Sequence, residues 1–115
     1  MALSVKELNM EQGMPTVDVA MGWLEAELTA ARKMGRPALK LIHGYGSSGR
    51  GGKIRTACRK YLRQQAESGR VRLVIAGEDF SIFSEETRLS FRLCGELRQD
   101  RDLDGENRGV TFVLL

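Results

Sequence analysis

The sequence has few of the residues that hold together small extracellular domains or metal sites. It contains two cysteines and one histidine among 115 residues, too few for a disulfide framework or for the ligand spacing of a structural zinc site. No apolar run approaches the roughly 20 residues that span a bilayer. The first residues, MALSVKELNMEQ, carry charges where a signal peptide has its hydrophobic stretch. We therefore expect a reduced, cytoplasmic protein with no structural metal and no membrane partner.

The chain has enough apolar residues for one domain, and its charge is unevenly distributed. With 115 residues, 42% of them hydrophobic, it has the length of a single domain with one core. Between positions 32 and 72 there are 12 lysines and arginines and a single acid, Glu67, whereas the rest of the chain has 6 basic and 14 acidic residues. A block of one sign in a small domain favours a polyanionic partner, of which nucleic acid is the commonest in a cytoplasm.

The apolar pattern predicts strands that alternate with helices. Strands are expected over residues 15–19, 38–42, 71–76 and 110–114, and helices from 23 to a stop at Gly35, from 53 to a stop at Gly69, and from Ser84 to about Leu93. This alternation predicts βαβ units, and hence an α/β fold with a mainly parallel sheet. Residues 1–13 have weak periodicity and are expected to form a tail or an edge segment, which leaves residues 14–115 for the domain.

A glycine-rich turn between the second strand and the second helix is the most unusual stretch. Residues 43–52 read HGYGSSGRGG, and the helix after them carries several basic residues. A strand that ends in such a turn and opens a helix directs backbone N–H groups and the positive end of the helix dipole at one place, where an anion can bind. The turn therefore predicts a phosphate-binding site, with a plain surface loop as the alternative.

Two small-molecule sites have related patterns. Gly44-x-Gly46-x-x-Gly49 matches the dinucleotide fingerprint, but the acidic residue that should follow about 20 residues later is missing, and Glu78 comes too late. The phosphate-loop pattern fails because Gly52 stands where lysine is required. We expect no small-molecule cofactor.

The turn and its surroundings resemble a known family. Leu41-Ile42-His43-Gly44-Tyr45-Gly46, the glycines after it and the helix start Ile54-Arg55 are similar to the signature of the Smr (small MutS-related) domain, an isoleucine-His-Gly-x-Gly turn followed by a leucine-arginine helix start. With a similar last strand, the resemblance covers about residues 16–115. It implies a two-layer βαβαββ sandwich with a four-stranded mixed sheet of order 1-2-4-3, similar to the C-terminal domain of bacterial translation initiation factor three.

The resemblance also implies a function. Members of the family bind DNA or RNA, and several are nicking endonucleases or RNA endonucleases, which points to DNA repair, recombination or RNA quality control. The family's first motif, leucine-Asp-leucine-His-Gly at the end of strand one, is matched here to residues 17–22, where Asp18 is kept and Ala20 replaces the histidine. Because the Asp-x-His element is the one most closely tied to cleavage, this difference favours binding over hydrolysis. If the protein is a nuclease, Asp18 and His43 would be its catalytic residues, with a divalent metal such as magnesium.

We therefore expect a domain that binds DNA or RNA through its turn and basic helix, with endonuclease activity as the alternative. His43 is expected to contact phosphate, and Tyr45 to stack on a base, whereas Trp23 is assigned to the core. Asp18 could accept a hydrogen bond from His43 or from the glycine loop, or serve as an anion at the N-terminus of the first helix. A protein-interaction module using the acidic stretch 96–106 is a third class of function. The expected nucleic-acid contacts are His43, Gly44, Tyr45, Gly46, Ser47, Ser48, Gly49, Arg50, Lys53, Arg55, Arg59 and Arg63.

Overall fold

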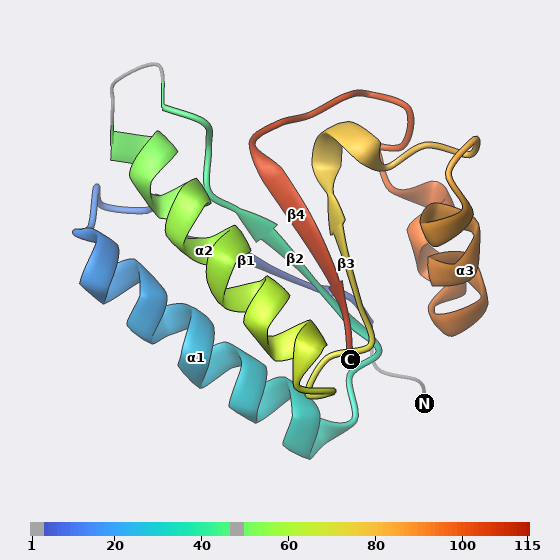
Figure 1. Cartoon of the computed structure of the whole chain (residues 1–115), viewed down its shortest axis with the longest axis horizontal. Helices are drawn as coiled ribbons and strands as arrows, with labels where there is room; N and C mark the ends of the chain where they lie inside the picture. Colours follow the sequence, from blue (N-terminus) through green and yellow to red (C-terminus); the bar gives the residue numbers. More distant parts are fainter. Residues whose placement is uncertain (1–3, 47–49) are drawn as a thin grey trace.

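A computed structural model describes residues 4–46 and 50–115. Its four-stranded sheet has the order β1-β2-β4-β3 (Figure 1). The strands are β1 (Lys6–Asn9), β2 (Ala38–Ile42), β3 (Leu73–Ala76) and β4 (Val110–Leu114). β1 pairs parallel with β2, and β4 pairs antiparallel with both β2 and β3, so that only β4 runs against the other three strands. The mixed sheet and its strand order confirm the α/β fold that the resemblance implies. The mainly parallel sheet expected from the alternation of strands and helices is wrong, because only the β1–β2 pair is parallel among the described residues.

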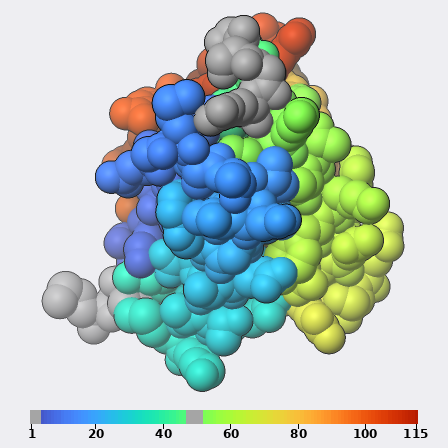
Figure 2. Space-filling model, turned by 90° about the vertical axis from the view of Figure 1, so that its left-hand side faces the viewer, coloured from blue at the N-terminus to red at the C-terminus, as the bar shows by residue number. Residues whose placement is uncertain are grey.

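Helices cover both faces of this sheet. Helices α1 (Val17–Met34) and α2 (Arg50–Glu67) lie side by side on one face (Figures 1 and 2), where Leu39 and Leu41 of β2 join their core cluster. Helix α3 (Glu85–Leu93) and the short 3-10 helix η2 (Gly95–Gln99) pack on the opposite face, against Phe112 and its neighbours. The expected additional helix before the last strand is therefore present, and it adds partial cover to the second face of the sandwich.

The strand expected over residues 15–19 is wrong. Thr16 is instead the N-cap of α1, and its Oγ1 accepts a hydrogen bond from the Val19 N–H at 3.3 Å. The helix then buries residues at helical spacing from its second turn onward: Ala20, Leu24, Leu28 and Ala31. This buried stripe outweighs the strand propensity of the two β-branched valines. The helix thus begins at Val17, six residues before the expected start.

The first strand lies earlier in the chain than the sequence pattern indicated. β1 (Lys6–Asn9) forms a parallel ladder with β2 at one edge of the sheet, and Leu8 packs against the core under α1 and α2. The sheet of the domain thus extends into the segment 1–13. The strand has four residues, of which Leu8 packs against the core. It is too short to show a clear alternation of apolar and polar residues in the sequence.

The remaining elements agree with the expected ones within a few residues. β2, β4 and α3 have the expected positions, and the Ser84 hydroxyl caps α3 by accepting a hydrogen bond from the Thr87 N–H at 3.4 Å. The third strand is followed by a 3-10 turn, η1 (Gly77–Asp79). Trp23, expected in the core, lies on the exposed side of α1. In the part of the chain that the structure describes, no helix has the length and apolar character that crossing a membrane requires.

Candidate nucleic-acid interface

The glycine turn lies at the end of the sheet where three parallel strands finish. Because β1, β2 and β3 run in the same direction, their carboxyl ends lie together, at the upper end of the sheet in Figure 1. The segments that leave them lead to the N-termini of α1 and α2 and into η1. Helix N-termini carry unpaired N–H groups and partial positive charge. This end of the molecule is therefore suited to bind anions.

The turn is fixed to the start of β4 by its backbone. The N–H groups of His43 and Gly44 both donate to the carbonyl oxygen of Gly109, at 2.9 and 3.0 Å. Gly44 has φ +68° and Gly46 has φ +87°, a region that disfavours any side chain. A Cβ on Gly44 would also collide with the carboxylate of Glu11, which lies directly over the turn. The conformation of the turn thus requires glycine at position 44.

We expect Gly44→Ala to lower the free energy of unfolding by about 1 to 2 kcal/mol, through the strained φ and the displacement of Glu11. Gly35→Ala is the matched control, because Gly35 has φ +73° with open space around it. Urea unfolding of both variants measures the difference. Adding Glu11→Ala to Gly44→Ala should recover only the part of the lost stability that is due to the collision with the Glu11 side chain. Equal losses in the two single variants would show that Glu11 does not confine the turn.

His43 is buried below the turn and both its ring nitrogens are occupied. Its side chain is 0% exposed. Nδ1 donates to the Gly44 carbonyl at 2.7 Å, and Nε2 then accepts from the Thr111 hydroxyl at 2.8 Å. Burial above all, together with the nearby charges of Arg59 and Arg55, lowers the pKa of His43 from 6.5 to about 4. The imidazole is therefore neutral at pH 7 and holds the turn, and the expected direct contact with a phosphate is not available to it in this arrangement.

Asp18 makes no hydrogen bond with the His43 ring, whose two nitrogens are hydrogen-bonded to Gly44 and Thr111. It is exposed in the first turn of α1, where a negative charge interacts favourably with the helix dipole. The helical position follows from the correction at residues 15–19, since Asp18 is no longer at the end of a strand. The two expected catalytic residues therefore share no hydrogen bond in the structure.

Two of the expected phosphate-binding arginines share one carboxylate. Arg59 forms a bidentate ion pair with Glu78, with N–O distances of 2.8 and 2.7 Å, and Arg55 donates a hydrogen bond to the same carboxylate at 2.9 Å. The Arg59 Nε also donates to the Thr111 hydroxyl at 3.1 Å, which continues the chain of hydrogen bonds from His43. Hydrogen bonds from Arg59 are the main cause that lowers the pKa of Glu78 to about 2. Arg59 therefore connects η1 to β4, and its side chain is less exposed than that of Arg55, 16% against 28%.

Three other cations of α2 are more exposed than this pair of arginines, and the last of them, Arg63, follows Arg59 by four residues on the same face of the helix. Lys53, Lys60 and Arg63 are exposed, and their spacing of seven and three residues places them along one stripe. Tyr45 is 63% exposed, and its ring lies next to Gly109 at the start of β4. Ser47, Ser48 and Gly49, together with the side chain of Arg50, are expected contacts that lie outside the described residues. We define the basic stripe as Lys53, Lys60 and Arg63.

Comparison with known proteins identifies the family. The sequence model of the Smr domain matches residues 12–79, more than half of the chain. The chain belongs to the Smr domain family. Its fold is similar to the crystal structure of the Smr domain of Thermus thermophilus MutS2, with 28% identity, a TM-score of 0.60, and 96% of this chain and 98% of that chain covered. No curated protein sequence matched the chain.

The structure changes the position that corresponds to the first family motif in this Smr domain. Since strand one is β1 (Lys6–Asn9), the end of strand one is at Asn9 and Met10, and residues 17–22 belong to a helix. Ala20, matched to the motif's histidine, is buried in the core of α1 and α2. The match at Ala20 is therefore wrong, although the end of β1 has no histidine either.

Sequence reasoning missed two acidic residues of this Smr domain's candidate site. Glu11 follows β1 and lies over Gly44, and Glu78 follows β3 and pairs with the two arginines. Glu78 could have been found, because the carboxyl ends of parallel strands meet at one end of a sheet. Glu11 gave no such signal, because the strand before it was not recognised.

Proposed function

We propose that this Smr domain binds nucleic acid through phosphate contacts along the basic stripe and at the glycine turn. The observation that carries the proposal is the exposed line of Lys53, Lys60 and Arg63, which starts at the helix N-terminus beside the turn. Ten residues of α-helix are about 15 Å long, and one strand of B-DNA rises about 3.4 Å per phosphate. The stripe therefore spans about four phosphates of one strand.

The contacts proposed here favour the backbone over the bases. Lysine and arginine side chains at a helix surface, and N–H groups at a helix N-terminus, recognise phosphate oxygens and carry no sequence information. Exposed Tyr45 adds a ring on which one unstacked base can rest. We therefore expect weak sequence preference and a stronger interaction with strands that contain unpaired bases.

A hydrolytic function has no comparable support from the described residues. A general base must reach the water or hydroxyl from which it removes a proton. The imidazole of His43 is fully buried, both its nitrogens are engaged, and its pKa of about 4 makes it a weak base. We therefore assign His43 to positioning the turn, and the proposal is restricted to binding.

Salt dependence tests the proposal. Fluorescence anisotropy with labelled single-stranded DNA, duplex DNA and single-stranded RNA should give an affinity whose logarithm falls linearly with the logarithm of salt concentration. Lys53→Ala should flatten the slope by about 0.7 to 0.9, the contribution of one phosphate. Lys33→Ala is the matched control, because this exposed lysine lies in the last turn of α1, away from the turn. Salt-insensitive binding, or equal effects of the two variants, would contradict the proposal.

A further inference from the structure

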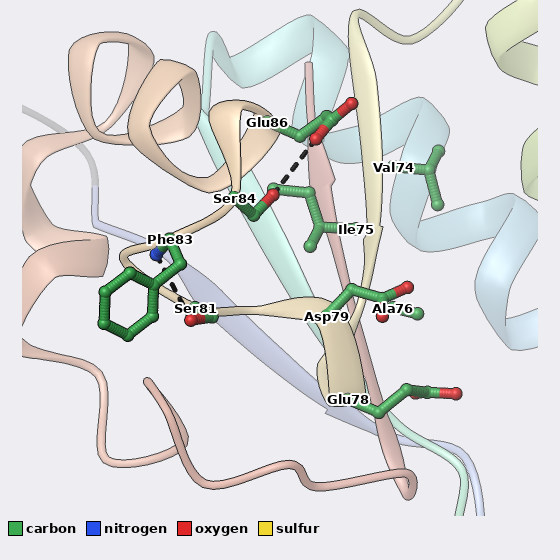
Figure 3. A pocket seen from close by; sticks show the side chains of 9 residues that line it. All are labelled: Val74, Ile75, Ala76, Glu78, Asp79, Ser81, Phe83, Ser84 and Glu86. Atoms are coloured by element: carbon green, nitrogen blue, oxygen red, sulfur yellow. Dashed lines mark hydrogen bonds between the residues drawn. The ribbon is translucent and has the colours of Figure 1, made fainter.

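The free edge of β3 borders a groove on the side of the molecule away from β1. In the order β1-β2-β4-β3, β3 has a strand on one side only. The groove is lined by Val74, Ile75 and Ala76 of the strand and by residues from η1 to the first turn of α3 (Figure 3). An edge strand presents unpaired N–H and C=O groups on which a further strand can form. The groove therefore has the backbone groups that strand addition requires.

Apolar side chains are held in the open beside this edge. Phe83 is 85% exposed and Ile82 47% exposed. The loop that carries them is fixed: the Phe83 N–H donates to the Ser81 hydroxyl at 3.2 Å, and Arg88 donates to the Ile82 carbonyl at 2.7 Å. Contact with an apolar partner removes such an exposed aromatic ring from water, which favours binding. Because the loop is already fixed, little conformational entropy is lost.

The surroundings of the groove are acidic. Between Leu73 and Thr87 there are four acidic residues and no basic one. The two arginines of α2 neutralise Glu78, whereas Asp79, Glu85 and Glu86 are exposed and take part in none of the ion pairs found in the described ranges. Arg88, which reaches the Ile82 carbonyl, is one cation beside the groove. The three exposed carboxylates outnumber it, so the groove favours a cationic partner over a polyanion.

Three of the five acids in the stretch 96–106 are used inside the fold. The side chain of Lys40, 1% exposed, pairs with Asp100 at 3.0 Å and with Asp102 at 2.6 Å. Glu96 accepts a hydrogen bond from the Val5 N–H at 2.9 Å. Of the other two acids, Asp104 accepts a hydrogen bond from the Ile82 N–H at 3.2 Å, and Glu106 is exposed and takes part in no ion pair of the described residues.

We propose that the β3 edge docks an extended segment of a partner protein as an additional strand, with lysine or arginine alternating with apolar side chains. Backbone groups of β3 pair with the segment, Phe83 covers one of its apolar side chains, and Asp79 and Glu86 hold its cations. This surface is separate from the basic stripe. The domain would thus contact nucleic acid on one side and a basic protein segment on another.

A designed peptide tests this docking on the full chain. The probe is a fluorescein-labelled eight-residue peptide of alternating lysine and valine with blocked ends, and its binding is measured by anisotropy. We expect saturable binding with a Kd below about 1 mM. Phe83→Ser should weaken it roughly tenfold, because a large apolar contact is lost. Asp79→Asn with Glu86→Gln should weaken it at least about threefold.

Three controls make the test decisive. Glu25→Gln with Glu67→Gln removes two exposed charges from α1 and α2 and should leave peptide binding unchanged. A peptide in which proline replaces alternate residues keeps the charges of the lysines but loses backbone N–H groups, and it should not bind. Nucleic-acid affinity should not fall in Phe83→Ser, so failure of this proposal is distinguishable from failure of the proposed function.

The opposite results would overturn the docking proposal. These are no peptide binding up to about 1 mM, equal binding of the proline peptide, or equal effects of the groove and control pairs of substitutions. Sedimentation of the protein alone gives one more such outcome. Concentration-dependent dimers that Phe83→Ser abolishes would assign the groove to a second copy of this chain.

Discussion

Acidification from about pH 7.5 to about pH 5 is expected to lower the free energy of unfolding by about 2 kcal/mol through His43 alone. The pKa of His43 is about 4 in the folded protein against 6.5 without the fold. Below pH 6.5 the unfolded chain therefore binds a proton that the folded chain excludes. The stability from the neutral imidazole is complete above this pH and is lost progressively as the pH falls toward 4.

The measurement is urea unfolding at several pH values, with His43→Gln as the comparison. His43 is the only histidine of the chain, so no other imidazole contributes in this range. Glu78 contributes only at lower pH, because its pKa falls from 4.5 to about 2. The variant should lose less stability than the parent between about pH 7.5 and pH 5.

A spectroscopic readout keeps the prediction testable if His43→Gln does not fold. The NMR signals of the His43 ring in the parent protein should stay those of the neutral form with a proton on Nδ1 down to about pH 5. Protonation with a midpoint near 6.5 would show that the ring is solvated, and the positioning role of His43 would then be wrong.

The sequence predicted most of the elements on which the site depends. The apolar pattern predicts a strand over residues 38–42, before the glycine turn, and a helix after the turn. These are β2 and α2 in the structure. These elements are apolar on clear faces and end at glycines, so that local pattern and tertiary packing agree. The start of α3 was predicted from Ser84, whose hydroxyl caps the helix.

The N-terminal part of the domain was predicted wrongly because two local signals competed. Val17 and Val19 favour a strand by their branched side chains, but the capping hydroxyl of Thr16 and the buried stripe from Ala20 onward belong to a helix. The true first strand has four residues, and its pairing with β2 supplies the order that its own pattern lacks. Long-range pairing of this kind is not visible in a short segment.

The candidate site was predicted in part for a related reason. Spacing along α2 identifies which residues share a face, but not which acid of another element lies opposite. Arg59 was expected to bind phosphate, but its guanidinium group is paired with the carboxylate of Glu78, 19 positions later in the chain. Burial of His43 follows from the return of β4 beside β2, a contact between distant parts of the chain.

Glu78→Gln is expected to change stability and nucleic-acid affinity in opposite directions. Loss of the charge weakens three charge-assisted hydrogen bonds from Arg55 and Arg59. We expect a loss of about 2 kcal/mol in the free energy of unfolding. Arg59 keeps its bonds to Thr111 and to the Val110 carbonyl, whereas the more exposed Arg55 becomes available to a phosphate.

The freed guanidinium should raise affinity for single-stranded DNA about threefold to tenfold at low salt and steepen the salt slope by about one phosphate. Asp79→Asn is the matched control, because it removes a neighbouring exposed charge that takes part in no ion pair of the described residues. It should raise affinity less and leave stability nearly unchanged. Lower affinity in a folded Glu78→Gln variant would show that the carboxylate itself orders the binding surface, and that Arg55 is not held back from phosphate by Glu78.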